Sequence, residues 1–173
     1  MKKYLTSFPK LIAEWHPTKN GELNPQGFTH GSNTVVWWKC PLAFDHEWDA
    51  PIYSRVAGNG CPFCSGKLPS SKYNLQLTHP EIVEDWHPTA NGELKPTQVT
   101  KGSWHEIYWQ CKEVLEHVYP MSVYNRTAGK KCSYCAGQKV HKTNSLATHF
   151  PDIAKEWQQV GENSLTSTEK LET

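Results

Sequence analysis

Long apolar runs are missing from this chain of 173 residues. No stretch approaches the roughly 20 apolar residues that a membrane-spanning helix requires, so we expect no membrane partner. The first residues, MKKYLTSFPKLIAEW, also lack the continuous apolar core of a secretory signal, because Thr6, Ser7, Pro9 and Lys10 interrupt them. We therefore expect a cytoplasmic protein, in a compartment where disulfide bonds are rare.

An excess of charge of either sign is missing as well. The chain has 18 Lys and Arg against 17 Asp and Glu, a formal net charge of +1, which excludes a strongly basic nucleic-acid-binding protein. The length suits one ordinary domain, or two or three small units whose cores are too thin to be stable alone. Small units of that kind need a disulfide or a metal ion to hold them together.

The sequence repeats itself. When it is shifted by 71 residues, AEWHPTKNGELNP at 13–25 falls on EDWHPTANGELKP at 84–96 without a gap. The same register then pairs Trp38 with Trp109, Cys40 with Cys111, His46 with His117, Tyr53 with Tyr124, Arg55 with Arg126, Gly58 with Gly129, Cys61 with Cys132 and Cys64 with Cys135. A third copy begins with FPDIAKEW at 150–157.

The six cysteines form two equivalent sets of three, and an odd number per set does not close into disulfides within one unit. Each set has the spacing C-x5-H-x14-C-x2-C, which supplies two close ligand pairs for a tetrahedral zinc ion. Buried structural thiols are the plainer alternative, but the doubled, gapless pattern favours zinc. We predict two zinc ions, one held by Cys40, His46, Cys61 and Cys64 and the other by Cys111, His117, Cys132 and Cys135.

The fourth ligand of each site has an alternative. His16 and His87, inside the two WHPT segments, are also in register. We favour His46 and His117, because a ligand six residues from its partner cysteine belongs to the same hairpin, whereas His16 must return across 24 residues.

These sets define the expected domains: a zinc-binding repeat at 1–70, a second at 71–141, and a partial third repeat at 142–173. The third has a helix and a loop but no zinc ligands, and we expect it to cap the second. If each helix packs on the cage that precedes it, this cap stabilises the second unit.

Each unit is predicted to run helix, loop, β-hairpin and zinc knuckle, an α+β fold of small zinc-stabilised tandem repeats. Ile82, Val83 and Trp86 share one helical face, and the segment 78–81 has the form of a capping box. We expect Trp86 and its equivalents Trp15 and Trp157 to pack on a hairpin rather than to bind a partner.

The hairpins follow from four segments rich in β-branched and aromatic residues. TVVWWKC at 34–40 and HEIYWQC at 105–111 are predicted as strands that enter the first ligand. HEWDAPIY at 46–53 and HVYPMSVY at 117–124 are predicted as the strands that leave it. Trp38 and Trp109 should then lie on the same face as the ligand cysteine, where they shield the metal.

Basic residues gather beside the predicted knuckles. No acidic residue occurs between Ala50 and Thr78, or between His117 and Lys142. The candidate nucleic-acid contacts in these stretches are Arg55, Lys67, Lys72, Arg126, Lys130, Lys131, Lys139 and Lys142. An ordinary solvated lysine surface is an equally weighted alternative. Each zinc ion with three thiolates adds a net −1, so two sites lower the formal charge from +1 to −1.

The motifs resemble those of the probable zinc-ribbon, or treble-clef zinc-finger, tandem repeat family of bacteria, their viruses and some plants. Its pattern matches Trp15 to Gly66, through the WHPTKNG, WKC, HEW, RVAG and CPFCSG segments, and the second copy from Trp86 to Gly137. Asp45 and Glu116 replace a glycine of that pattern, and Ser133 replaces its proline. The resemblance implies a zinc-binding treble-clef unit, and nucleic-acid binding because such repeats accompany nuclease-like domains.

We expect a protein that binds zinc and nucleic acid, DNA rather than RNA, through the basic faces beside its knuckles. The alternative is a protein-interaction module, an adaptor or inhibitor from a virus or mobile element, that uses exposed aromatic residues and the acidic segment 143–173.

Catalysis and a small-molecule substrate are not expected. Asp45, Glu47 and Asp49 surround His46, but the second copy has no acid after its histidine. A histidine that ligates zinc is also unable to act as a base.

Overall fold

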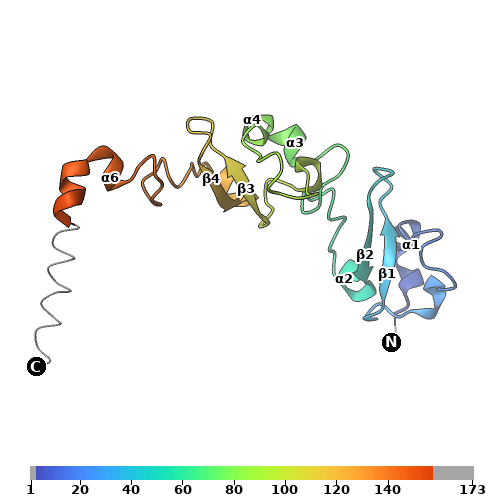
Figure 1. Cartoon of the computed structure of the whole chain (residues 1–173). Helices are drawn as coiled ribbons and strands as arrows, with labels where there is room; N and C mark the ends of the chain where they lie inside the picture. The colour runs from blue at the N-terminus through green and yellow to red at the C-terminus, as the bar shows by residue number, and fades with distance from the viewer. Residues whose placement is uncertain (1–2, 158–173) are drawn as a thin grey trace, which may run out of the picture.

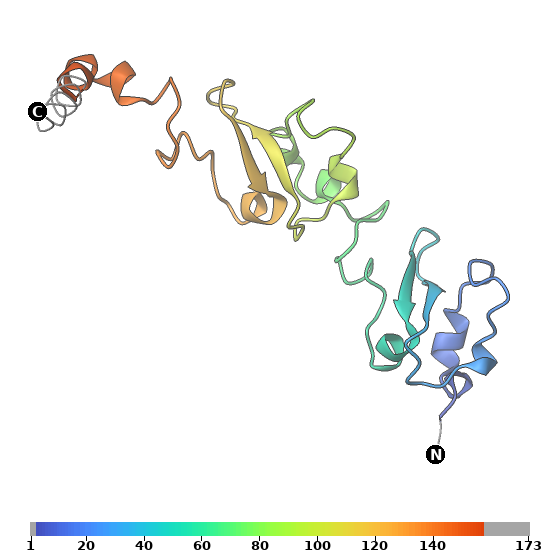
Figure 2. The ribbon, with the colours of Figure 1, turned by 60° about the horizontal axis from the view of Figure 1, so that its bottom comes forward.

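A computed structural model describes residues 3–157 of the chain as two similar units in a row, each built around one two-stranded antiparallel sheet (Figures 1 and 2). The first unit contains the helices α1 (Pro9–Ala13) and α2 (Ile52–Val56) and the strands β1 (Val35–Lys39) and β2 (Glu47–Pro51). The second contains α3 (Leu75–Thr78), α4 (Pro80–Val83), α5 (Val123–Thr127), β3 (Glu106–Gln110) and β4 (Val118–Ser122). No helix among residues 3–157 is long and apolar enough to cross a membrane.

The two hairpins have the same register, which confirms the predicted strands. Trp38 of β1 pairs with Trp48 of β2, and Trp109 of β3 pairs with Tyr119 of β4. The second strand of each hairpin ends earlier than predicted, however. The predicted strands ended at Tyr53 and Tyr124, but β2 ends at Pro51 and β4 at Ser122. Both tyrosines belong instead to the helices that follow, α2 and α5. The turn from strand to helix brings the arginine of each short helix back over the sheet.

A pair of tryptophans forms the centre of each core. The rings of Trp15 and Trp38 meet edge to face with centroids 5.8 Å apart, and those of Trp86 and Trp109 do the same at 5.7 Å. Trp38 and Trp109 are completely buried. The prediction that the helix-end tryptophans pack on the hairpin is therefore confirmed in both units. Edge-to-face aromatic pairs of this kind add to the free energy gained by burying their area.

The helix at the start of the second unit begins differently from the prediction. The expected capping box at 78–81 is wrong, because Thr78 ends the preceding helix α3 and its hydroxyl donates to the carbonyl of Asn74. The Asn74 side chain caps α3 by accepting from the N–H of Leu77. α4 then begins at Pro80, whose fixed φ suits the first position of a helix.

One arginine in each unit ties the helix to the knuckle. Arg55 is 6% exposed, lies over the rings of Trp38 and Trp48, and forms an ion pair with Glu14 just after α1. Its guanidinium also donates to the carbonyl of Asn59, in the loop that leads to Cys61. Arg126 of the second unit repeats this arrangement with Asp85 and with the carbonyl of Lys130, 3.2 Å away.

The third copy lacks a hairpin to pack against within the described residues. Its helix α6 (Leu146–His149) and the helical residues 151–157 lie away from both sheets (Figures 1 and 2). Leu146 is 42% exposed and Trp157 74% exposed, whereas the equivalent Leu75 is fully buried. The predicted packing of Trp157 on a hairpin, and of this helix on the preceding cage, is therefore wrong for these residues.

Residues just before that helix make the contact instead. The Thr143 hydroxyl lies 2.5 Å from Nε2 of His117, and the Asn144 side chain donates to the carbonyl of Tyr134. The remainder of the predicted cap, residues 158–173, lies outside the described residues, so the boundaries of the third unit stay a prediction.

Replacing Arg55 by methionine is expected to destabilise the first unit by about 2 kcal/mol. The loss should fall below the ~3–5 kcal/mol of fully buried pairs, because Glu14 keeps some contact with water. Chemical denaturation of the zinc-loaded protein measures the change. Lys10→Met, which removes a positive charge from an exposed position on α1, is the matched control and should change stability little. Equal stability of the two variants would contradict a stabilising role for the ion pair between Arg55 and Glu14.

Candidate metal centres

The structure gathers one histidine and three cysteines at the base of the first hairpin. Cys40 follows β1 and His46 precedes β2, while Cys61 and Cys64 come from the turn after α2. Sγ of Cys40 lies 3.6 Å from Sγ of Cys64, and Nδ1 of His46 lies 3.7 Å from Cys61 and 3.5 Å from Cys64. The two ligand pairs thus converge from the hairpin and the knuckle.

The second unit repeats this geometry with different neighbours. Sγ of Cys111 lies 3.6 Å from Sγ of Cys135, and Nδ1 of His117 lies 3.7 Å from Cys132 and 3.4 Å from Cys135. In both groups every ligand atom lies within 4.8 Å of the others. The substitution of Ser133 for proline in the knuckle has therefore left the ligand arrangement intact.

These separations fit tetrahedral zinc. Bonds of about 2.3 Å to sulfur and about 2.0 Å to nitrogen place the corners of a tetrahedron roughly 3.5–3.8 Å apart, close to the distances found. The donor set of three thiols and one imidazole is also a standard structural zinc set, which keeps no position open for a substrate. The two Cys3His sites fit two zinc ions, as the sequence predicts.

Both histidines offer Nδ1 to the site and turn Nε2 away. Nε2 of His117 meets the Thr143 hydroxyl, and Nε2 of His46 lies 3.9 Å from the Asp45 carboxylate. A partner on the second nitrogen fixes the orientation and tautomer of a metal-binding imidazole. Asp45 is itself held by the N–H of Ser71, 2.8 Å from its Oδ2, so the connector after the first knuckle supports the cage.

The close spacing of the cysteine sulfur atoms favours the binding of a cation. Burial and the neighbouring sulfur atoms of Cys40 and Cys61 raise the pKa of the Cys64 thiol to about 12. Burial, Cys111 and Cys132 raise the pKa of Cys135 to about 12 in the same way. Three thiolates at these distances repel one another, and a divalent cation removes that repulsion.

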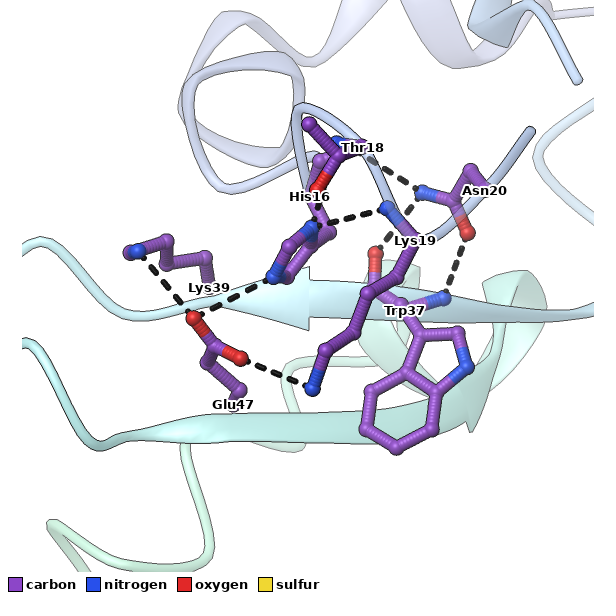
Figure 3. Close-up of polar contacts among 7 residues, drawn as sticks. All are labelled: His16, Thr18, Lys19, Asn20, Trp37, Lys39 and Glu47. Atoms are coloured by element: carbon purple, nitrogen blue, oxygen red, sulfur yellow. Dashed lines mark hydrogen bonds and ion pairs between the residues drawn. The ribbon is translucent and has the colours of Figure 1, made fainter. Parts of the chain in front are cut away.

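His16 has a different role from the one that its alternative assignment required. Its Nδ1 accepts from the N–H groups of Thr18 and Lys19, and its Nε2 lies 3.2 Å from the carboxylate of Glu47 (Figure 3). The ring is 4% exposed and lies outside the cysteine cluster. It shapes the WHPT turn, and the structure brings His46 to the metal site instead. His87 makes the same two backbone contacts in the second unit.

The Glu47 carboxylate contacts three basic side chains around the WHPT turn, those of His16, Lys19 and Lys39. Hydrogen bonds from Lys19, Lys39 and His16 lower the pKa of its carboxyl to about 2 (Figure 3). The second unit has Val118 at the equivalent position, so this ionic cluster is particular to the first unit. Glu47 is thereby committed to structural contacts, which does not favour its use as a catalytic acid.

Asn20 has a role that its sequence context did not reveal. The Asn-Gly pair indicated only a turn, yet the Asn20 amide accepts from the N–H of Trp37 and donates to its carbonyl, at 2.7 and 3.0 Å (Figure 3). Asn91 does the same with Tyr108. The asparagine side chain therefore makes the two hydrogen bonds to β1 or β3 that the backbone of a neighbouring strand would make. The repeated WHPTxNG spacing is the sequence feature that could have indicated this role.

The candidate nucleic-acid residues fall into two groups in the structure. Arg55 and Arg126 are engaged in the ion pairs described above, which does not favour the predicted contacts with phosphates. The six lysines have exposed side chains: Lys67, Lys72, Lys130, Lys131, Lys139 and Lys142. Lys142 forms an ion pair with Glu116 at 3.0 Å. The basic surface beside the knuckles therefore consists of lysines.

Two units that each close a Cys3His cluster between a hairpin and a knuckle define a tandem zinc-finger protein of the treble-clef kind. The family model described as "Probable Treble clef zinc finger domain" matches the chain at residues 11–67 and again at 82–138. The matches together span more than half of the chain and each contains one ligand set, so the protein belongs to this family. A search of curated proteins found no match.

Substitution of His46 by alanine is expected to halve the zinc content, from two ions to about one per chain, because the first site loses a ligand. His16→Ala should keep both ions and only destabilise the first unit. Metal analysis of the two purified variants measures the difference. Full zinc in His46→Ala with a loss in His16→Ala would reverse the assignment.

Removal of zinc by a chelator is expected to abolish the tertiary structure of both units, because cores this small depend on the metal for their folding free energy. Near-ultraviolet circular dichroism, which reports the packing of Trp38 and Trp109, measures the loss. Zinc added back should restore the spectrum. A metal-free protein that keeps its native spectrum would contradict this dependence.

Proposed function

We propose that the protein is a non-enzymatic zinc-finger protein that binds nucleic acid through the exposed lysines beside its two knuckles. DNA is the first candidate and RNA the second. The zinc ions have a structural role, holding the turn that carries Lys67 after Cys64 and the turn that carries Lys130 and Lys131 before Cys132.

The pairing state of the lysines carries the proposal. Among the lysines that lie elsewhere in residues 3–157, four form ion pairs with carboxylates, Lys19, Lys39, Lys112 and Lys155, and four do not, Lys3, Lys10, Lys95 and Lys101. Within residues 3–157, five of the six lysines beside the knuckles have no such ion pair, the exception being Lys142. Exposed ammonium groups without a carboxylate partner attract phosphates, and they release counterions when they bind them.

A protein partner is the second candidate function. The described part of the third copy exposes Leu146, Phe150, Ile153 and Trp157. In the second unit the equivalents of three of them, Leu75, Ile82 and Trp86, belong to the core or pack against it. Exposed apolar groups of this kind mark interaction sites as well as unfinished cores. We prefer nucleic-acid binding to protein binding because the unpaired lysines occur beside the knuckles of both units.

Reversing the charge of Lys130 and Lys131 to glutamate is expected to weaken the binding of duplex DNA. The slope of log affinity against log salt should become shallower by about 2, because each lost phosphate contact contributes about 0.9 to it. Fluorescence anisotropy over a salt series measures both quantities.

The matched control reverses Lys10 and Lys95, two exposed lysines outside the basic stretches, and should retain most of the affinity. Equal losses in both double variants would show that net charge alone matters. If the native protein binds neither DNA nor RNA at low salt, the protein-interaction function is favoured instead.

A further inference from the structure

An exposed aromatic pair stands on the second unit, apart from both cages. The rings of Trp104 and Tyr124 lie 4.6 Å apart between centroids and are inclined by 32°. Trp104 is 71% exposed and Tyr124 44% exposed. A tryptophan of such exposure gains little from burial, so the folding of the unit does not account for it.

The first unit supplies the comparison. Trp104 corresponds to Asn33, whereas the paired tryptophans Trp15 and Trp38 recur as Trp86 and Trp109. The backbone around the two positions is nevertheless the same. The carbonyl of Ser103 accepts from the N–H of Tyr124 at 2.8 Å, and that of Ser32 accepts from the N–H of Tyr53 at 3.0 Å. This loop therefore forms without an aromatic residue at its tip.

The loop holds Trp104 in place from both sides. Besides the Ser103 contact, the carbonyl of His105 accepts from the N–H of Val123, and the Ser103 hydroxyl lies 2.9 Å from Nδ1 of His105. These bonds anchor the loop to α5, the helix that carries Tyr124. A ring mounted on a fixed loop loses little conformational entropy when it binds a partner.

A groove of about 520 Å³ adjoins this tryptophan. One wall is the connector between the units, Lys67, Leu68 and Pro69, and the other includes Ser103, Trp104 and His105. No carboxylate lines it among residues 3–157, and Lys67 supplies a positive charge. The exposed Lys101 lies close by, since its carbonyl accepts from the Thr127 hydroxyl of α5.

We propose that Trp104 and Tyr124 form a stacking site for an unpaired base, and that this protein therefore binds single-stranded nucleic acid in preference to duplex. The site would take the base on the Trp104 ring, with the adjoining phosphates beside Lys67 and Lys101. This inference rests on the nucleic-acid-binding function proposed above and specifies its ligand.

The chemistry of the groove selects this ligand. Flat aromatic faces bind any base by stacking, while a cationic, carboxylate-free wall complements a phosphate backbone. Bases within a duplex are stacked on each other and do not offer their faces to Trp104. A single strand is thus the nucleic acid that satisfies both features of the groove at once.

The test compares fluorescein-labelled oligothymidylate and oligouridylate with a labelled mixed-sequence duplex at low salt, with the zinc-loaded full chain. Trp104→Asn, which introduces the residue of the first unit, should weaken single-strand binding by about 5- to 100-fold, because one stacked base is lost. Duplex binding should remain unchanged. Trp104→Phe, which keeps an aromatic face, should retain most of the single-strand affinity.

Trp157→Asn is the matched control, since Trp157 is also highly exposed but lies outside the groove, and it should bind both ligands as the native protein does. Single-strand binding unaffected by Trp104→Asn, or an equal loss for the duplex, would overturn the stacking site while the proposed function stands. A native protein that binds neither ligand would overturn the proposed function and, with it, this inference.

Discussion

Coordination of zinc by three cysteines and one histidine is the constraint on which each unit depends. The hairpin contributes Cys40 and His46, and the knuckle contributes Cys61 and Cys64, so the metal joins segments that two strands alone would not hold together. A two-stranded hairpin is only marginally stable in water. The cage makes it a platform on which the core tryptophans pack, and the same arrangement recurs in the second unit.

A second constraint links the start of each unit to its knuckle. The arginine of α2 or α5 reaches the acidic residue after the first helix and the carbonyl in the loop before the last two ligands. Helix, sheet and cage are thereby held by one side chain that spans the unit. Because the arginines are engaged in the fold, our proposal assigns contact with nucleic acid to exposed lysines and to Trp104, an aromatic residue that packing does not require.

The repeated sequence was enough to predict the hairpins, the packing of Trp15 and Trp86 on them and the six cysteine ligands, because the shift of 71 residues separates what both units need from what has drifted. It was not enough for the roles of Arg55 or Asn20. A repeated spacing shows that a side chain is used twice, but not whether it faces water or the core. The predicted capping box at 78–81 is wrong for a related reason. Asn74 caps an additional helix, α3, and Thr78 is the last residue of that helix rather than the cap of the next one.

The sequence by itself determined the metal, the stoichiometry and the repeat, because ligand type and spacing are local properties of the chain. Only the tertiary structure decided between His46 and His16, because that choice depends on which ring reaches the cysteines across the folded hairpin. It also separated ion-paired arginines from exposed lysines, and it brought Trp104 beside Tyr124 and the connector. Burial and proximity arise from long-range packing, which no single stretch of residues encodes.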